Sequence, residues 1–204
     1  MSRFGERHGG FAARGLTHGG FAARGLTDQV ILTAPDGAQA EIEVPFPPLP
    51  LHGDALVTLV DHALTAREVG AVLVRKGGYA VGVFDGSELL VSKVGSAYVQ
   101  GKTKAGGWSQ QRYARRRANQ TEQAYAAAAD VVADLLLPRV EQLVGIFGGG
   151  DRGAVHAVLD DPRLRRLGAL LVDPVLPTVD PRLRVLQAFP EQFRAVSIRL
   201  NALA

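Results

Sequence analysis

The sequence contains no cysteine, and its five histidines, at positions 8, 18, 52, 62 and 156, lie far apart along 204 residues. Disulfides, thiolate catalysis and cysteine-based zinc sites are therefore excluded, and we expect neither a metal nor a cofactor. No apolar run reaches the roughly 18 to 20 residues that a membrane-spanning helix needs, and the N-terminus lacks the uninterrupted apolar segment of a signal peptide. These absences predict a cytoplasmic protein that does not bind membranes.

Acidic residues are also absent from one long stretch. None occurs between Lys93 and Thr121, although the whole chain carries 20 acidic and 23 basic residues. Six cations lie between residues 102 and 117. Positive charge focused in this way indicates a phosphate-rich partner, because nucleic acids are bound by clustered lysine and arginine. The alternative is a passive, solvated basic helix face.

The composition allows one sizeable hydrophobic core, since 47% of the residues are hydrophobic and 21% are charged. Residues 8–17 and 18–27 are identical decapeptides, too few copies for a solenoid. Their glycines disfavour a continuous helix, so we expect short helical turns or a mobile arm. We therefore predict an N-terminal arm at 1–28 and a single catalytic domain at 29–204, acting as a monomer.

The first half of that domain alternates strand and turn signals. Residues 29–34 and 38–44 flank Pro35-Asp36-Gly37, which predicts a β-hairpin. A proline-rich linker at 45–50 precedes a helix over 54–65, with Asp54 as its cap. Strands are then predicted at 70–75, 79–84 and 88–93. Glycine turns separate these strands, so they should form an antiparallel meander.

The second half begins with a long helix. Ser109 can cap a helix that runs to about Leu137, and apolar residues from Tyr125 onwards recur at the spacing needed to cover a sheet. Alternating strands and helices follow, which predicts an α/β fold of the mixed-sheet, α+β kind. The expected elements are a strand at 143–147, a glycine-rich turn at 148–150, a helix from Arg152 capped by Asp151, a strand at 169–172, a helix from Pro181 and a strand at 195–200.

Arginines crowd the predicted first turns of the long helix, at positions 112, 115, 116 and 117. A helix N-terminus already carries partial positive charge, so each exposed arginine there costs about 0.3–1 kcal/mol. Stability alone favours acidic residues in the first turns of a helix, and the consistent presence of arginines there instead is typical of a functional site. A helix N-terminus flanked by arginines suits a phosphate backbone.

The segment before this helix carries a recognisable motif. After two lysines the chain reaches Gly106-Gly107, followed by Trp108-Ser109-Gln110-Gln111. This combination resembles the catalytic loop in the middle domain of eukaryotic and archaeal class-one peptide release factors, where Gly-Gly-Gln enters the ribosomal peptidyl transferase centre. The sequence is more similar still to the actinobacterial branch of the Vms-like release factor family, the peptidyl-tRNA hydrolase domain of ribosome quality control. That resemblance covers most of the chain and includes residues 44–48, 77–84, 92–96 and 149–152.

The resemblance implies a ribonuclease-H-like fold like that of the release factor middle domain, with an active loop at residues 106–111. It also implies hydrolysis of the peptidyl-tRNA ester on stalled ribosomes or large ribosomal subunits. A Ser-Gln pair after the glycines is the Vms-like pattern, which favours Gln110 as the catalytic glutamine and Gln111 as the second choice. Alignment on the arginines that follow would instead place Trp108 at the glutamine position of release factors. Gly106, Gly107 and Ser109 complete the predicted catalytic set.

A glutamine is chemically sufficient for this reaction. The ester on the tRNA 3′ end is already activated, so positioning a water and stabilising the oxyanion can suffice. Glutamine has both donor and acceptor atoms, and glycine amides can donate to an oxyanion. The indole of Trp108 can either stack on a terminal adenine or anchor the base of the loop. The predicted contacts to tRNA, mostly to its phosphates, are Lys102, Lys104, Trp108, Arg112, Arg115, Arg116 and Arg117.

Two other functions fit the same residues. A water-orienting loop beside arginines could serve a tRNA endonuclease that cuts near the 3′ CCA end. The basic patch could equally belong to a non-catalytic module that binds RNA or the ribosome. No serine, histidine and acid set is suggested by the sequence spacing, which makes a hydrolytic triad a poor interpretation.

Overall fold

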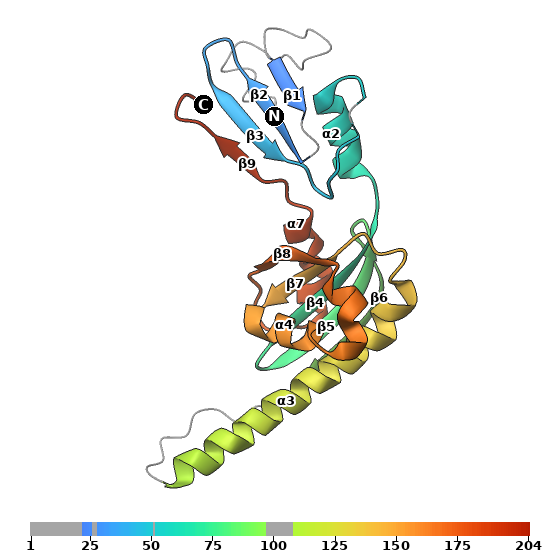
Figure 1. Ribbon diagram of the computed structural model, residues 1–204, viewed down its shortest axis with the longest axis vertical. Helices are drawn as coiled ribbons and strands as arrows, with labels where there is room; N and C mark the ends of the chain where they lie inside the picture. Colours follow the sequence, from blue (N-terminus) through green and yellow to red (C-terminus); the bar gives the residue numbers. More distant parts are fainter. Residues whose placement is uncertain (1–21, 26–27, 51, 97–107) are drawn as a thin grey trace. The chain divides into compact units, whose positions relative to one another are not determined.

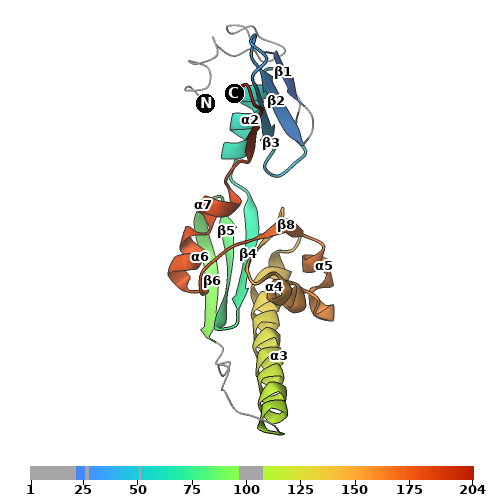
Figure 2. The same cartoon turned by 90° about the vertical axis from the view of Figure 1, so that its left-hand side faces the viewer.

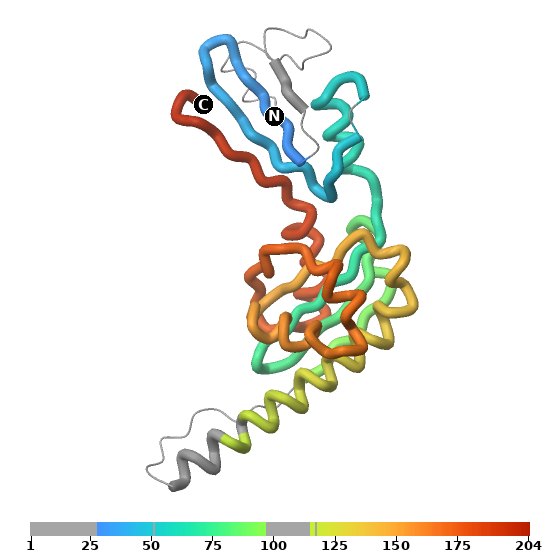
Figure 3. Tube along the Cα trace, viewed as in Figure 1, coloured from blue at the N-terminus to red at the C-terminus, as the bar shows by residue number. Residues whose placement is uncertain are grey.

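The computed structural model describes residues 22–25, 28–50, 52–96 and 108–204, and for 22–25, 108–114 and 117 it describes the backbone alone. The chain divides into two compact units, one of Met1–Thr65 with Arg194–Ala204 and one of Ala66–Phe193 (Figures 1 and 3). Both units contain residues from the range 29–204. The assignment of that range to one catalytic domain, with an arm at 1–28, stays a prediction. Within the described ranges, no helix is long and apolar enough to cross a membrane.

The first unit contains an antiparallel sheet of order β1-β2-β3-β9. The strands are β1 (Ala22–Gly25), β2 (Gln29–Thr33), β3 (Gln39–Glu43) and β9 (Ile198–Leu200). The predicted hairpin is confirmed, and its turn is closed by the Ala34 amide donating to the Ala38 carbonyl at 2.8 Å. Alternate residues of β2 and β3, such as Leu32 and Ile42, are buried because only one face of this sheet meets the core.

Helix α2 (Ala55–Leu64) contributes Ala55 and Leu59 to that core. The predicted cap is confirmed, since the Asp54 carboxylate accepts from the amides of Leu56 and Val57 at 2.8 and 3.0 Å. These bonds satisfy donors that the first helical turn leaves without partners. The helix therefore begins where the sequence places it.

Two predictions for this unit were wrong. Residues 22–25, within the second decapeptide, form an edge strand on β2 and not helical turns. Large apolar residues are not needed there, because an edge strand is held by backbone hydrogen bonds. The predicted final strand is shorter than expected and pairs with β3, through Ile42 and Ile198, so it does not join the mixed sheet.

The second unit is built on a mixed sheet of order β6-β5-β4-β7-β8. Its first three strands form the predicted antiparallel meander, and β7 and β8 add in parallel to β4. The α+β fold with a mixed sheet is thus confirmed. The strands are β4 (Glu68–Arg75), β5 (Gly78–Asp85), β6 (Glu88–Ser96), β7 (Ile146–Gly150) and β8 (Leu171–Leu176).

Helices cover both faces of this sheet (Figure 2). On one face, α3 (Trp108–Leu136) and α4 (Arg152–Leu159) pack on Val72, Val81 and Val83. On the other face lie α6 (Leu183–Ala188) and α7 (Pro190–Phe193), with the rings of Phe189 and Phe193. The Phe193 ring stacks on Phe147 with centroids 4.8 Å apart. Short helical segments follow α3 and α4, namely η1 (Leu137–Arg139), η2 (Pro162–Leu164) and α5 (Arg165–Gly168).

The predicted glycine-rich turn at 148–150 was wrong, because these glycines lie within β7. A Cβ on Gly148 would lie 2.9 Å from Cγ1 of Val155, so the missing side chain lets α4 approach the sheet closely. Gly150, the last residue of β7, has φ of 99°, a backbone angle that glycine adopts readily and that lets the chain leave the strand toward α4. The next residue, Asp151, caps α4 as predicted by accepting from the Ala154 amide at 3.2 Å.

Candidate functional site

Helix α3 has one half that belongs to the core and another that does not. Ala128, Val132 and Leu136 are fully buried against the sheet. Arg115, Arg116 and Asn119 are exposed, and the helix continues past the ends of the strands (Figure 2). The apolar stripe predicted from the sequence accounts for this, since it begins only at Tyr125. The core-packed half thus holds the cationic half out in solvent.

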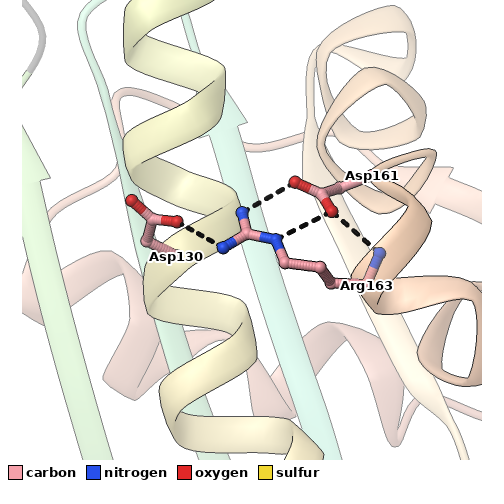
Figure 4. Close-up of polar contacts among 3 residues, drawn as sticks. All are labelled: Asp130, Asp161 and Arg163. Carbon is pink, nitrogen blue, oxygen red and sulfur yellow. Dashed lines mark hydrogen bonds and ion pairs between the residues drawn. The ribbon is translucent and has the colours of Figure 1, made fainter.

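An arginine clamp fixes the core-packed half of α3 to the segment after α4 (Figure 4). Arg163 binds both carboxylate oxygens of Asp161, with Nε at 3.0 Å and Nη2 at 2.7 Å, and its backbone amide adds a third bond. Its Nη1 lies 2.8 Å from the Asp130 carboxylate on α3. The Arg163 side chain and amide hold the pKa of Asp161 at about 2. The Asp161 carboxylate therefore stays charged at neutral pH.

The exposed half of α3 carries the charge that the sequence predicts. Neither Arg115 nor Arg116 pairs with an acidic side chain in the described ranges. Asn119 and Gln123 follow Arg115 at four-residue intervals, so these side chains share one helix face. They line a single shallow surface hollow together with Arg116 and Gln120. Such a face can bind phosphates and offer amides to neighbouring polar groups.

The predicted active loop is described only in part. Gly106, Gly107, Lys102 and Lys104 lie outside the described residues. Trp108, Ser109, Gln110, Gln111, Arg112 and Arg117 lie on α3, and of these only the backbone is described. The assignment of Ser109 as the cap was wrong, because α3 begins at Trp108 and Ser109 falls inside its first turn. Their catalytic and RNA-binding roles stay predictions.

A second hollow, of about 600 Å³, lies between α3 and α4. Ala126, Ala129 and Ala157 are among its lining residues, and acidic side chains rim it at Glu122, Asp160 and Asp161. Burial raises the pKa of Tyr125 in this hollow, and the charge of Asp151 raises it further. An acidic rim does not suit RNA, so the cationic face of α3 is the better candidate for a nucleic-acid contact.

Sequence reasoning missed one close contact near the end of β6. Tyr79 on β5 lies directly opposite Gly95 on β6, one residue before β6 ends at Ser96. Their contact depends on strand pairing, which brings together residues far apart in sequence. A signal was present, since Gly95 occupies a strand interior where glycine is disfavoured.

A family model described as the Actinobacteria/chloroflexi VLRF1 release factor matches residues 67–199. The chain belongs to this release factor family. The matched region contains nearly all of the mixed-sheet unit, including α3 and the segment before it. No curated protein matches the chain in sequence.

Solved structures with a related arrangement are distant in sequence. One is an archaeal translation termination factor, aRF1, with 16% identity and a TM-score of 0.49 over 78% of this chain and 49% of that chain. Another, described as an archaeal protein, has 17% identity and a TM-score of 0.40 over 76% of this chain and 47% of that one. The chain therefore spans about half the length of either protein.

Proposed function

We propose that this family member is a peptidyl-tRNA hydrolase that frees nascent chains from tRNA on stalled ribosomes or large ribosomal subunits. Its family membership supports a role as a release factor. The observation that carries the proposal is the exposure of Arg115 and Arg116 on α3, a helix that directly follows Gly106-Gly107 and contains Gln110. The proposal is supported because cations and a candidate water-positioning glutamine occur on one segment of the sequence, which suits a reaction at a tRNA end. Action on ribosomes would place the protein in the cytoplasm.

In this proposal the backbone and Gln110 perform the chemistry. The amide of Gln110 orients a water toward the ester carbonyl, and the amides of Gly106 and Gly107 donate to the oxyanion. No metal or cofactor is needed, because the ester is activated and held close to the water. Ser109 supports the glutamine, and Gln111 is the alternative water-positioning residue.

The cations of the same segment hold the tRNA. Arg115 and Arg116 are exposed on α3 and contact acceptor-stem phosphates, as do Lys102, Lys104, Arg112 and Arg117. Phosphate contacts of this kind position a nucleic acid without reading its sequence. Trp108 either stacks on the terminal adenine or anchors the loop base.

The reaction class is tested by mapping the RNA product of a large-subunit complex that carries peptidyl-tRNA. We expect free peptide together with tRNA whose 3′ CCA end is intact. A shortened tRNA would instead identify an endonuclease. Binding without any release of peptide would identify a non-catalytic module, and either result would overturn the proposal.

The catalytic glutamine is tested by Gln110→Ala, for which we expect a loss of peptide release of about 100-fold, typical of removing one group that stabilises a transition state. The melting temperature should hardly change, because the α3 side chains that pack in the described core begin at Tyr125, well beyond Gln110. Gln187→Ala is the matched control, since Gln187 is exposed on α6, on the opposite face of the sheet. Full activity in Gln110→Ala together with loss in Gln111→Ala would move the role by one residue.

A further inference from the structure

The hollow between α3 and α4 has a mostly apolar floor. Ala126, Ala129 and Ala157 line it together with Tyr125, which also packs against the core. Alanine leaves space that a longer apolar side chain at the same position would fill. The volume of about 600 Å³ falls within the range in which proteins bind small ligands and the side chains of partners. The hollow therefore offers apolar surface to a side chain from outside.

The two walls of this hollow are fixed relative to each other. Arg163 binds both carboxylate oxygens of Asp161, a lining residue, and its Nη1 reaches Asp130 on α3 at 2.8 Å (Figure 4). Val132 of α3 and Val155 of α4 belong to one buried cluster. A preformed site loses less conformational entropy when a partner binds. The hollow is thus shaped before any partner arrives.

The rim of the hollow carries negative charge. Glu122 on α3 and Asp160 are exposed, and within the described ranges neither forms an ion pair with a basic side chain. Asp160 is the C-cap of α4, so the partial negative charge of that helix end lies at the same rim. The third rim carboxylate, Asp161, is already paired with Arg163. A cation at this rim is therefore attracted by two carboxylates and by a helix C-terminus.

Lysine and arginine are the side chains that suit an apolar floor with an acidic rim. Their methylene stems cover apolar surface while the charged head stays at the edge. The ring of Tyr125 offers a further attraction to a cation. RNA and anionic lipids are disfavoured, because the rim repels their phosphates. A second copy of this chain fits poorly, since its exposed Arg115 and Arg116 are the cations assigned to RNA above.

We propose that the hollow between α3 and α4 is a docking site for a lysine- or arginine-rich segment of a ribosomal protein. This inference rests on the function proposed above, because action at the ribosome brings basic protein segments to this surface. Charge complementarity selects each partner. RNA meets Arg115 and Arg116, and the basic protein segment meets Glu122, two turns after Arg115 on the same helix. Helix α3 thus contacts the RNA and the protein of the ribosome through charges of opposite sign.

The first test reverses the rim charge by combining Glu122→Lys with Asp160→Lys. Both residues are exposed, and lysine is favourable at the C-terminus of α4, so the fold should survive. Affinity for purified large ribosomal subunits should fall about tenfold or more, because the new lysines face a basic segment. Affinity for isolated tRNA should stay the same or rise, because positive charge has been added. An unchanged or higher affinity for the subunit would overturn the inference.

The matched control makes the same change of charge elsewhere, by combining Glu88→Lys with Asp134→Lys. Glu88 is the first residue of β6 and Asp134 lies further along α3, and both are exposed outside the hollow. We expect this variant to bind the large subunit at least as tightly as wild type does. Equal weakening by the two pairs of substitutions would show that net charge governs binding, and would overturn the inference.

The apolar floor is tested without any change of charge. Ala126→Phe fills the hollow and should weaken binding to the large subunit, because the stem of the incoming side chain loses its place. Ala127→Phe is the control, since Ala127 is also exposed on α3 but does not line the hollow. Neither variant should change the affinity for isolated tRNA. Subunit binding that is equally affected by both substitutions, or by neither, would overturn the inference.

The occupant is identified by photo-crosslinking. A benzophenone amino acid in place of Ala126 is irradiated on purified large subunits, and the crosslinked fragments are identified by mass spectrometry. We expect a lysine- or arginine-rich segment of a ribosomal protein. Crosslinks only to ribosomal RNA would place RNA in the hollow, and crosslinks only to a second copy of this chain would identify a dimer. Either result would overturn the inference.

These measurements report binding and not peptide release, so the two proposals fail separately. A wild-type protein that binds large subunits and releases no peptide would overturn the proposed function alone. A wild-type protein that releases peptide, and whose affinity is unchanged by Glu122→Lys with Asp160→Lys, would overturn the docking site alone. A wild-type protein that does not bind large subunits would overturn both.

Discussion

At the scale of single residues, the structure depends on carboxylates that accept bonds at defined points. Asp54 and Asp151 each cap a helix, and Asp161 holds Arg163 in place beside α3. The caps are local, because the acceptor and the donor lie within three residues. The Arg163 clamp is partly long-range, since Asp130 belongs to a different helix.

The Arg163 clamp leads to a pH-dependent prediction. The pKa of Asp161 is lowered from 3.8 to about 2 in the folded protein. The ion pair with Arg163 therefore stabilises the fold above about pH 4, and this stabilisation is lost as the pH falls toward 2. Arg163→Gln should therefore lower the melting temperature at pH 7, and the difference from wild type should shrink between about pH 4 and 2. Thermal unfolding monitored by circular dichroism checks this.

Arg184→Gln is the control for the loss of one charge, because Arg184 is exposed on α6, which covers the other face of the sheet. Its effect on the melting temperature should be small at every pH. A difference between Arg163→Gln and wild type that stays constant down to pH 2 would contradict a role for the Asp161 carboxylate.

At the scale of the element, α3 combines two functions along one helix. Its second half packs on the sheet, and its first half presents cations. Replacing Arg115 and Arg116 by glutamine should weaken binding to tRNA or the large subunit and reduce the logarithmic salt slope by roughly two units, about one for each lost phosphate contact. Binding isotherms at several salt concentrations measure this slope.

The matched control removes the same charge elsewhere, by replacing Arg182 and Arg184 at the start of α6. We expect that variant to keep the wild-type salt slope, because α6 lies on the opposite face of the sheet from α3. If both pairs of substitutions reduced the slope equally, net charge and not the α3 face would govern binding.

Strand β1 gives a second prediction at this scale. Deleting residues 8–17 leaves an identical decapeptide before Asp28, so β1 keeps its sequence and its register on β2. The melting temperature and the hydrogen exchange of β2 amides should stay unchanged. Deleting residues 8–27 removes β1, so exchange in β2 should accelerate because that edge loses its backbone partner. Equal behaviour of the two deletions would argue against pairing of β1 with β2.

At the scale of the whole molecule, each of the two units has buried hydrophobic residues of its own. Leu32 is fully buried in the core of the first unit and Leu73 in the mixed-sheet unit. Leu32→Ala should cost about 2–5 kcal/mol of stability, as large-to-small core substitutions do. Because Leu32 and Leu73 belong to different units, hydrogen exchange in the Leu32→Ala protein should rise over residues 28–50 and stay unchanged over 68–85.

Leu73→Ala should give the reverse pattern, with faster exchange over 68–85 and wild-type exchange over 28–50. Mass spectrometry of peptic fragments resolves both regions. Acceleration of both regions by either substitution would show that the two units unfold together as one cooperative body.

Much of the fold and part of the site follow from the sequence. The hairpin around Pro35-Asp36-Gly37, the three-strand meander, the cap at Asp54 and the apolar stripe of α3 all depend on neighbours within a few residues. Hydrophobic periodicity and turn-forming residues indicate such local contacts directly in the sequence. The exposed arginines of α3 were predicted for the same reason, since a helix face that lacks apolar residues cannot enter a core.

Other features were decided only by tertiary structure. The pairing of β9 with β3, the place of Gly148 within β7 and the packing of Tyr79 on Gly95 join residues whose contact depends on how strands and helices are arranged. The sequence around Gly148 predicts a turn, because a turn and a close approach of a helix to a strand both require a residue without a side chain. Only the packing of α4 on the sheet distinguishes the two cases. The sequence by itself therefore determined most of the strands and helices, although not β1 or the glycines of β7, and where the positive charge lies. Tertiary structure decided which strands pair and which side chains fill the space beside a glycine, because those contacts depend on distance in space and not along the chain.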